Sequence, residues 1–195
     1  MDMPYDATDT PEEVLLARYA RGDALAARIL SERLVPRALG FAARMLRDQA
    51  EAEDVTQEAM LRLWRMAPDW RSGEAQVGTW LYRVVANLCT DRLRRRKTVP
   101  IDTVPDPQDG APGPVAGLIA GERAAALDAA LADLPERQRQ AVVLRHLEGL
   151  SNPEIAAVMD VGVEAVESLT ARGKRALTAR LAGRRADLGY EDEPG

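Results

Sequence analysis

Residues 51–64 read EAEDVTQEAMLRLW, and this stretch carries the most informative helical pattern in the chain. At 100° per residue, one side of the helix would hold Val55, Thr56, Ala59, Met60 and Leu63. The other side would hold Glu51, Asp54, Gln57, Glu58, Arg62 and Arg65. Leu61 lies in the middle of this charged side, where a solvated helix rarely places a leucine. A charged stripe around one exposed apolar residue predicts a docking surface for another protein.

The composition of the whole chain favours helices. The 195 residues are 46% hydrophobic but only 4% aromatic, which disfavours strands and suits one ordinary domain or two small ones. No apolar run is long enough to span a bilayer, and the acidic N-terminus does not resemble a signal peptide. We therefore expect a cytoplasmic protein without direct membrane insertion. The single Cys89 fits a reducing compartment.

The charge distribution is more informative than the net charge of −5. Acidic residues gather at the two ends of the chain and between residues 51 and 58. One basic cluster consists of Arg92, Arg94, Arg95, Arg96 and Lys97. A second consists of Arg172, Lys174, Arg175, Arg180, Arg184 and Arg185. The chain is thus acidic overall and is expected to present two basic surfaces to DNA.

The helical pattern predicts an all-α fold of two small domains. The expected helices cover about residues 12–21, 24–47, 50–66, 78–96, 118–131, 135–147, 152–159 and 163–182. Between residues 98 and 117 the pattern gives way to five prolines among Asp and Gly, which predicts a flexible Pro-rich linker. The predicted domains are therefore residues 12–97 and 118–182.

The second domain is predicted to contain a helix-turn-helix. Ser151 and Glu154 have capping-box spacing before a short helix, and residues 160–162 (DVG) form a tight turn before a longer one. On that longer helix Val163, Val166, Thr170, Gly173, Leu177 and Leu181 would pack inwards. The outer face would hold Glu164, Glu167, Ser168, Ala171, Arg172 and Arg175, which suits a major groove. The alternative is an ordinary amphipathic helix with a solvated face.

The first domain offers a second candidate DNA surface. On the helix from residue 78, the side opposite the apolar stripe holds Trp80, Arg83, Asn87, Asp91 and Arg94. An aromatic ring, an amide and guanidinium groups at this spacing can stack on an unpaired base, read its edge and hold phosphates. The alternative is that Trp80 belongs to the core and that the charges only cap the helix.

The sequence lacks the motifs of an enzyme. It contains no Gly-rich phosphate loop and no Cys-x-x-Cys pair, and no serine or cysteine nucleophile has a paired base. The only histidine is His146, near a helix end, so the acidic residues of the chain have no partner for a Glu-x-x-His metal site. We expect no catalytic residue, no metal and no cofactor.

Three motifs in order resemble the sigma-70 family of RNA polymerase sigma factors. Residues 54–64 (DVTQEAMLRLW) are similar to its core-polymerase-binding helix, and residues 79–87 (TWLYRVVAN) to its −10 recognition helix. Residues 134–145 (LPERQRQAVVLR) and 149–156 (GLSNPEIA) resemble its region 4, which binds the −35 element. The short chain, with region 2 joined directly to region 4, resembles the extracytoplasmic-function (ECF) group.

The resemblance implies roles at matching positions. Core polymerase would be bound by Asp54, Gln57, Glu58 and Leu61, which would face the clamp helices of the β′ subunit. The −10 element would be held by Trp80, Arg83, Asn87 and Arg94, and the −35 duplex by Glu167, Ser168, Ala171, Arg172 and Arg175. Glu167 and Leu169 replace basic residues of many relatives, and Asn152-Pro153 is an unusual entry to its helix.

The implied partners are core RNA polymerase, through its β′ and β subunits, promoter DNA and a cognate anti-sigma factor. A helix-turn-helix regulator that acts without polymerase remains the alternative function. A helical adaptor whose basic faces bind acidic partners is a third. The acidic helix with Leu61 argues against the plain regulator, and the Pro-rich linker argues against a rigid adaptor.

Overall fold

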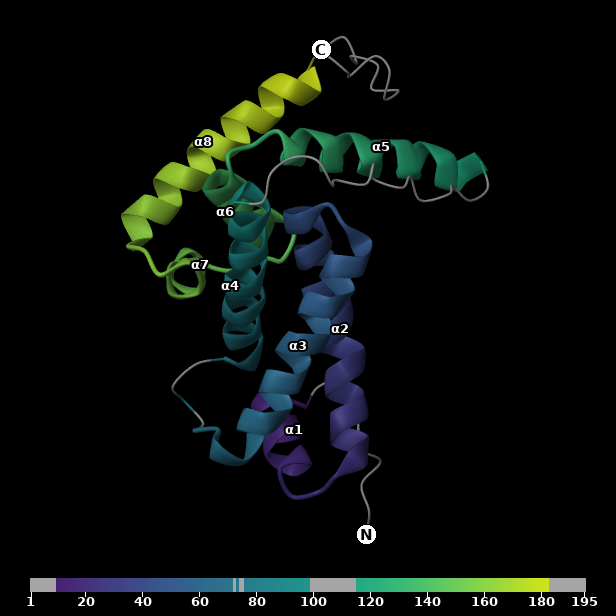
Figure 1. Cartoon of the computed structure of the whole chain (residues 1–195), viewed down its shortest axis with the longest axis vertical. Helices are drawn as coiled ribbons and strands as arrows, with labels where there is room; N and C mark the ends of the chain where they lie inside the picture. The colour runs from purple at the N-terminus through teal and green to yellow at the C-terminus, as the bar shows by residue number, and fades with distance from the viewer. Residues whose placement is uncertain (1–9, 72, 74–75, 99–114, 183–195) are drawn as a thin grey trace. The chain divides into compact units, whose positions relative to one another are not determined.

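The computed structural model describes residues 10–71, 73, 76–98 and 115–182, and the regular elements of these residues are all helical (Figure 1). The predicted all-α fold is confirmed. The elements are α1 (Glu12–Tyr19), α2 (Ala24–Leu46), α3 (Gln49–Met66), the 3₁₀ turn η1 (Ala67–Asp69), α4 (Val77–Thr98), α5 (Val115–Ala132), α6 (Glu136–His146), α7 (Asn152–Met159) and α8 (Val163–Ala182). No helix within these described ranges is long and apolar enough to cross a membrane.

The chain divides into two compact units, as predicted. One comprises residues 1–97 with 157–160, and the other comprises residues 98–156 with 161–195. Helix α5 begins at Val115. Residues 115–117, which were expected to belong to the linker, are therefore helical. The rest of the expected linker, residues 99–114, lies outside the described residues, and so do Arg184 and Arg185. The domain boundaries stay a prediction.

The first unit is built on the long helix α2. Asp23 caps it by accepting hydrogen bonds from the backbone N–H groups of Leu25 and Ala26, at 3.0 and 3.2 Å. The helix ends where Arg47 takes a left-handed conformation with φ 56°. Helices α1 and α3 pack against it, and Figure 1 shows α2 and α3 side by side. Fully buried core side chains include Leu15, Leu16, Leu30, Leu34, Phe41, Leu46 and Leu63.

Helix α4 also contributes to this core. The rings of Phe41 on α2 and Tyr82 on α4 meet edge to face at 5.7 Å between centroids. The guanidinium of Arg37 lies 5.5 Å from the centre of the Tyr82 ring. These contacts fix the apolar side of α4, so its opposite side is left for the candidate DNA residues.

The second unit places α8 against α5 and α6. Gly173 permits the close approach of α8 to α6, because a Cβ there would lie 2.6 Å from Cγ2 of Val142. Val166 is fully buried in the same face. Val163 was expected to pack inwards too, but its side chain is 40% exposed. It is the first residue of α8, next to the turn, so no residue of a preceding helical turn covers it.

Candidate functional site

The acidic helix α3 has the two faces that the sequence predicted. Asp48 begins the helix by accepting a hydrogen bond from the Glu51 N–H over 2.9 Å. The inner face is buried and consists of Ala52, Val55, Thr56, Ala59, Met60 and Leu63. The Thr56 hydroxyl donates to the Ala52 carbonyl oxygen over 2.8 Å, which satisfies its polar group inside the core. Burial of this face holds the other face towards solvent.

The outer face of α3 brings the four predicted polymerase-binding residues together. Asp54 and Gln57 are exposed, Glu58 is half-buried, and Leu61 is 41% exposed. A carboxylate oxygen of Glu58 accepts a hydrogen bond from Arg62 Nε over 2.8 Å. This arrangement is an apolar side chain with acidic groups on the same helix face, which is suited to a basic, amphipathic partner.

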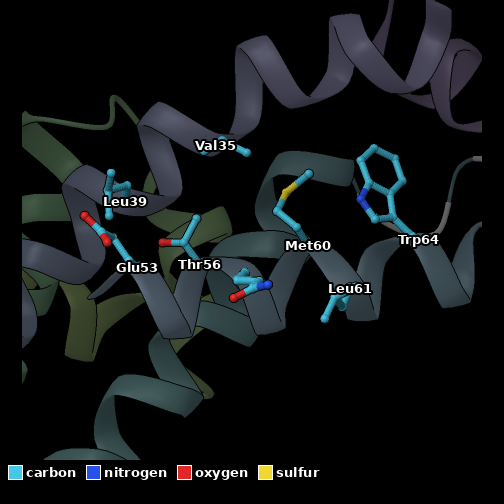
Figure 2. Close-up of a pocket in the computed structure, with 8 residues that line it drawn as sticks. Val35, Leu39, Glu53, Thr56, Met60, Leu61 and Trp64 are labelled. Atoms are coloured by element: carbon cyan, nitrogen blue, oxygen red, sulfur yellow. The ribbon is translucent and has the colours of Figure 1, made fainter. Parts of the chain in front are cut away.

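A groove beside this face was not predicted. Its volume is ≈350 Å³, and it is lined by Val35, Leu39, Glu53, Thr56, Gln57, Met60, Leu61 and Trp64. In Figure 2 the side chains of Met60 and Trp64 extend from α3 towards α2, where Val35 and Leu39 lie. Six of the eight lining residues belong to α3. Val35 and Leu39 come from another helix, and a pattern along one helix cannot identify such a pairing.

The candidate −10 residues on α4 do not share one fully exposed face. Arg83 and Asn87 are exposed, but Trp80 is half-buried. Its ring stands edge-on to Trp70 from the loop, at 6.3 Å between centroids. Arg94 is exposed and forms an ion pair with Asp91 at 3.0 Å. Trp80 was interpreted either as a DNA-facing residue or as a core residue. The structure fits both in part, because the side chain is half-buried and packs against Trp70.

Two side chains of the basic cluster at the end of α4 make contacts with neighbouring helices. Arg96 donates to the Leu46 carbonyl oxygen over 2.9 Å and pairs with Glu51 at 2.8 Å. Its positive charge thereby complements the negative C-terminal end of α2 and pairs with an acidic side chain in the first turn of α3. Arg92 lies 3.7 Å from the carboxylate of Asp54. These two arginines link α4 to the acidic helix, so the cluster is not a surface for DNA alone.

The helix-turn-helix forms as the capping box predicted. The Ser151 N–H donates to Glu154 Oε2 over 2.7 Å, and the Glu154 N–H meets the Ser151 hydroxyl oxygen at 3.5 Å. After α7 the chain turns at Asp160, which has φ 52°. The predicted tight turn at residues 160–162 therefore uses an aspartate in the left-handed region.

The five candidate −35 residues all lie on the exposed face of α8, namely Glu167, Ser168, Ala171, Arg172 and Arg175. Arg172 Nε donates to the Ser168 carbonyl oxygen over 3.2 Å, so its guanidinium runs along the helix surface. Glu167 Oε1 accepts a hydrogen bond from Asn152 Nδ2 at the start of α7, over 3.4 Å. The sequence singled out Asn152 and Glu167 separately, but spacing alone gave no sign that they meet.

His146 lies at the end of α6, exposed as expected. Partial burial of its ring, together with the nearby charges of Lys174 and Arg145, lowers the pKa of the imidazole below its usual value. Cationic neighbours disfavour a metal ion at this position. Within the part of the chain that the structure describes, no three His, Cys, Asp or Glu residues gather as a metal site would require.

Comparison with known families identifies both units. The description "Sigma-70 region 2" matches residues 30–99, and "Sigma-70, region 4" matches residues 124–177. The first match contains all the candidate polymerase and −10 residues. The second contains the helix-turn-helix and the candidate −35 residues.

Individual proteins agree with these matches. The ECF RNA polymerase sigma factor SigM of Mycobacterium tuberculosis is 38% identical over 170 residues, which cover 87% of this chain and 83% of SigM. The structure of CnrH in complex with the cytosolic domain of CnrY has a TM-score of 0.65 at 27% identity, covering 91% of this chain and 99% of CnrH. The sigma factor RpoE of Bartonella quintana, in complex with the anti-sigma factor NepR, has a TM-score of 0.60 at 20% identity. That match covers 78% of this chain and 94% of RpoE, and it shows the shared fold.

Proposed function

The chain belongs to the extracytoplasmic-function group of the sigma-70 family, and we propose that it binds core RNA polymerase, directs it to promoters through −10 and −35 elements, and assists promoter opening. Sigma factors are non-enzymatic initiation factors, so the chemistry of this protein is recognition. The observation that carries the proposal is the exposed acidic face of α3 around Leu61.

Core binding is assigned to Asp54, Gln57, Glu58 and Leu61. Leu61 is 41% exposed and lines the groove between α2 and α3, so a partner helix can bury it together with the half-buried Trp64. The surrounding carboxylates select a basic partner and steer its approach. The proposed partner surface is the pair of clamp helices of the β′ subunit, with further contacts to the β subunit.

The −10 element is assigned to α4 and the loop before it. Trp80 and Trp70 form an aromatic corner, and Arg83 and Asn87 are exposed on the same helix as Trp80. Stacking on an unpaired base and reading its edge with an amide would favour the melted state of the promoter. Arg94 would leave its ion pair with Asp91 and bind a phosphate.

The −35 element is assigned to the exposed face of α8. Ser168 lies closer than Arg175 to the helix N-terminus, the end that reaches base edges in a helix-turn-helix. Ala171 permits close approach, and Arg172 can pair with guanine or phosphate. Arg175 is assigned to phosphate.

Control by an anti-sigma factor is the last part of the proposal. The B. quintana RpoE of the same fold was solved with an anti-sigma factor, and the family resemblance implies such a partner. The proposed site of action is the cytoplasm, where polymerase and promoter DNA are found. The acidic face of α3 is a surface that such a partner would cover to block polymerase.

The proposal is tested by co-elution of the full chain with sigma-free core polymerase. The double variant Asp54→Arg, Glu58→Arg should lose core binding, because each desolvated ion pair at such an interface is worth ~2–5 kcal/mol. Far-UV circular dichroism should show unchanged helix content. The matched control reverses two other exposed carboxylates, Glu32→Arg and Asp133→Arg, and should bind core normally.

Two outcomes would overturn parts of the proposal. Normal core affinity in the Asp54, Glu58 variant would show that α3 is not the polymerase surface. A wild-type chain that binds duplex DNA but never co-elutes with core would instead be a helix-turn-helix regulator.

A further inference from the structure

Two polar residues of the helix-turn-helix meet across its two helices. Asn152, the first residue of α7, donates a hydrogen bond from Nδ2 to Oε1 of Glu167 on α8, over 3.4 Å. Glu167 is exposed and adjoins Ser168 on the face assigned to the −35 duplex. A carboxylate on that face is repelled by phosphates, so its placement opposes the general attraction of α8 to DNA.

The contact is not needed to cap α7. Glu154 supplies the cap, because its Oε2 accepts from both the N–H and the hydroxyl of Ser151. The Asn152–Glu167 bond instead holds a second carboxylate near the start of the same helix, where the positive end of the helix dipole stabilises negative charge. A long and otherwise mobile side chain is thereby restricted before DNA arrives.

We propose that Asn152 is a positioning residue for Glu167, and that the second carboxylate oxygen of Glu167 accepts a hydrogen bond from the N4 amine of a cytosine in the −35 element. The inference rests on the proposed function, because it requires α8 to enter the major groove. Oε1 is engaged by Asn152, and Oε2 is the oxygen assigned to the base.

Cytosine is the base that matches an ionised carboxylate, which can only accept hydrogen bonds. Its major-groove edge offers the N4 amine as a donor. Guanine offers only the acceptors O6 and N7 there, and adenine places the acceptor N7 beside its N6 amine, where it repels a carboxylate. The expected specificity is therefore one C·G pair in a fixed orientation.

The test measures binding of full-length variants to a panel of −35 duplexes substituted at each position in turn. Asn152→Asp keeps the shape of the side chain, replaces the donor with a repelling charge, and is favourable in the first turn of a helix. The wild type should prefer C·G at one position, and Asn152→Asp should reduce that discrimination about tenfold. Thermal unfolding should not change, because the capping box is kept.

Two further variants separate positioning from charge. Glu167→Ala should lose the same discrimination, and adding Asn152→Asp to it should change the preference no further. The matched control Asp133→Asn removes a negative charge from the loop before α6, outside the face assigned to the −35 duplex. It should tighten binding to every duplex slightly and leave the base preference unchanged.

Each contrary result overturns a distinct claim. Equal weakening of all duplexes by Asn152→Asp would show that Asn152 acts by charge or phosphate contact, and the positioning role would be wrong. An unchanged preference in Glu167→Ala would show that Glu167 reads no base, while −35 recognition would stand. A wild-type chain without preference for any duplex would refute −35 recognition, and the inference with it.

Discussion

Replacing Gly173 with alanine should destabilise the packing of α8 on α6, although alanine is the better helix former. The new Cβ would stand 2.6 Å from Cγ2 of Val142 and 3.1 Å from the backbone oxygen of Gln138. Val142 is 2% exposed and β-branched, so its methyl group has no other rotamer to adopt cheaply. The carbonyl oxygen of Gln138 belongs to the α6 backbone. One helix therefore has to shift.

Two opposing contributions determine how much Gly173→Ala changes the free energy of unfolding. Inserting a methyl group into a packed core costs about 1–3 kcal/mol through strain and displacement. Replacing glycine by alanine inside a helix returns about 1 kcal/mol. The free energy of unfolding of the second unit should therefore fall by about 1 kcal/mol.

Hydrogen exchange of the α6 and α8 amides in the full chain measures this change, because it reports opening of those helices directly. The chain has an internal control. Its three tryptophans, Trp64, Trp70 and Trp80, all lie in the first unit, so their fluorescence should be unaffected. Slower exchange in Gly173→Ala, which would mean that the helix propensity gain dominates, would refute the close-approach reasoning.

The companion variant Val142→Ala tests the cause. Alone it should destabilise by about 1.6 kcal/mol, at about 0.8 kcal/mol for each of two buried methyl equivalents. In that background Gly173→Ala should destabilise less, because the atom at 2.6 Å has been removed and the closest remaining contact is the Gln138 oxygen at 3.1 Å. Additive effects would show that the two residues do not compete for space.

Three further outcomes are expected. Asn87→Ala should impair promoter opening, seen by permanganate footprinting, more than it impairs −35 binding, by about 1–3 kcal/mol for a lost base contact. Arg175→Ala should weaken binding to promoter and scrambled duplexes equally, and should reduce the slope of log affinity against log salt concentration by about one. Titrations at two salt concentrations would measure both; a changed preference at a single base pair would contradict the phosphate role. Glu154→Ala should accelerate amide exchange in α7 by removing the acceptor at 2.7 Å from the Ser151 N–H, at a cost of about 1 kcal/mol, with tryptophan fluorescence as the control.

The sequence was most informative where one helix has two distinct faces. In α3 a period of 3.6 separated Val55, Ala59 and Leu63, which are fully buried, from Leu61, which is exposed. The capping box of Ser151 and Glu154 likewise located the start of α7, because its geometry depends on residues three apart in the same chain segment. Local patterns of this kind are visible without knowledge of tertiary structure.

Features that join different helices could not be predicted in this way. The groove needs Val35 of α2 beside Trp64 of α3, and Arg96 of α4 reaches the Leu46 carbonyl oxygen of α2. Neither pairing leaves a periodic signal, since it depends on how helices pack. The half-burial of Trp80 has the same origin, because its neighbour Trp70 comes from the preceding loop. The tight turn at residues 160–162 was predicted, but its spacing did not indicate which residue takes the left-handed conformation, which is Asp160.

The ion pair between Arg92 and Asp54 decides how readily α3 can exchange partners. The two groups are 3.7 Å apart, and the Asp54 side chain is 69% exposed, so the pair is worth at most ~1 kcal/mol. A desolvated pair with a basic partner helix would be worth ~2–5 kcal/mol. Asp54 can therefore leave Arg92 for a partner at little cost. Until then Arg92 keeps the carboxylate paired. If the proposed partner takes Asp54, Arg92 would be released on the same helix as the candidate −10 residues, where its charge would add to the attraction for promoter phosphates.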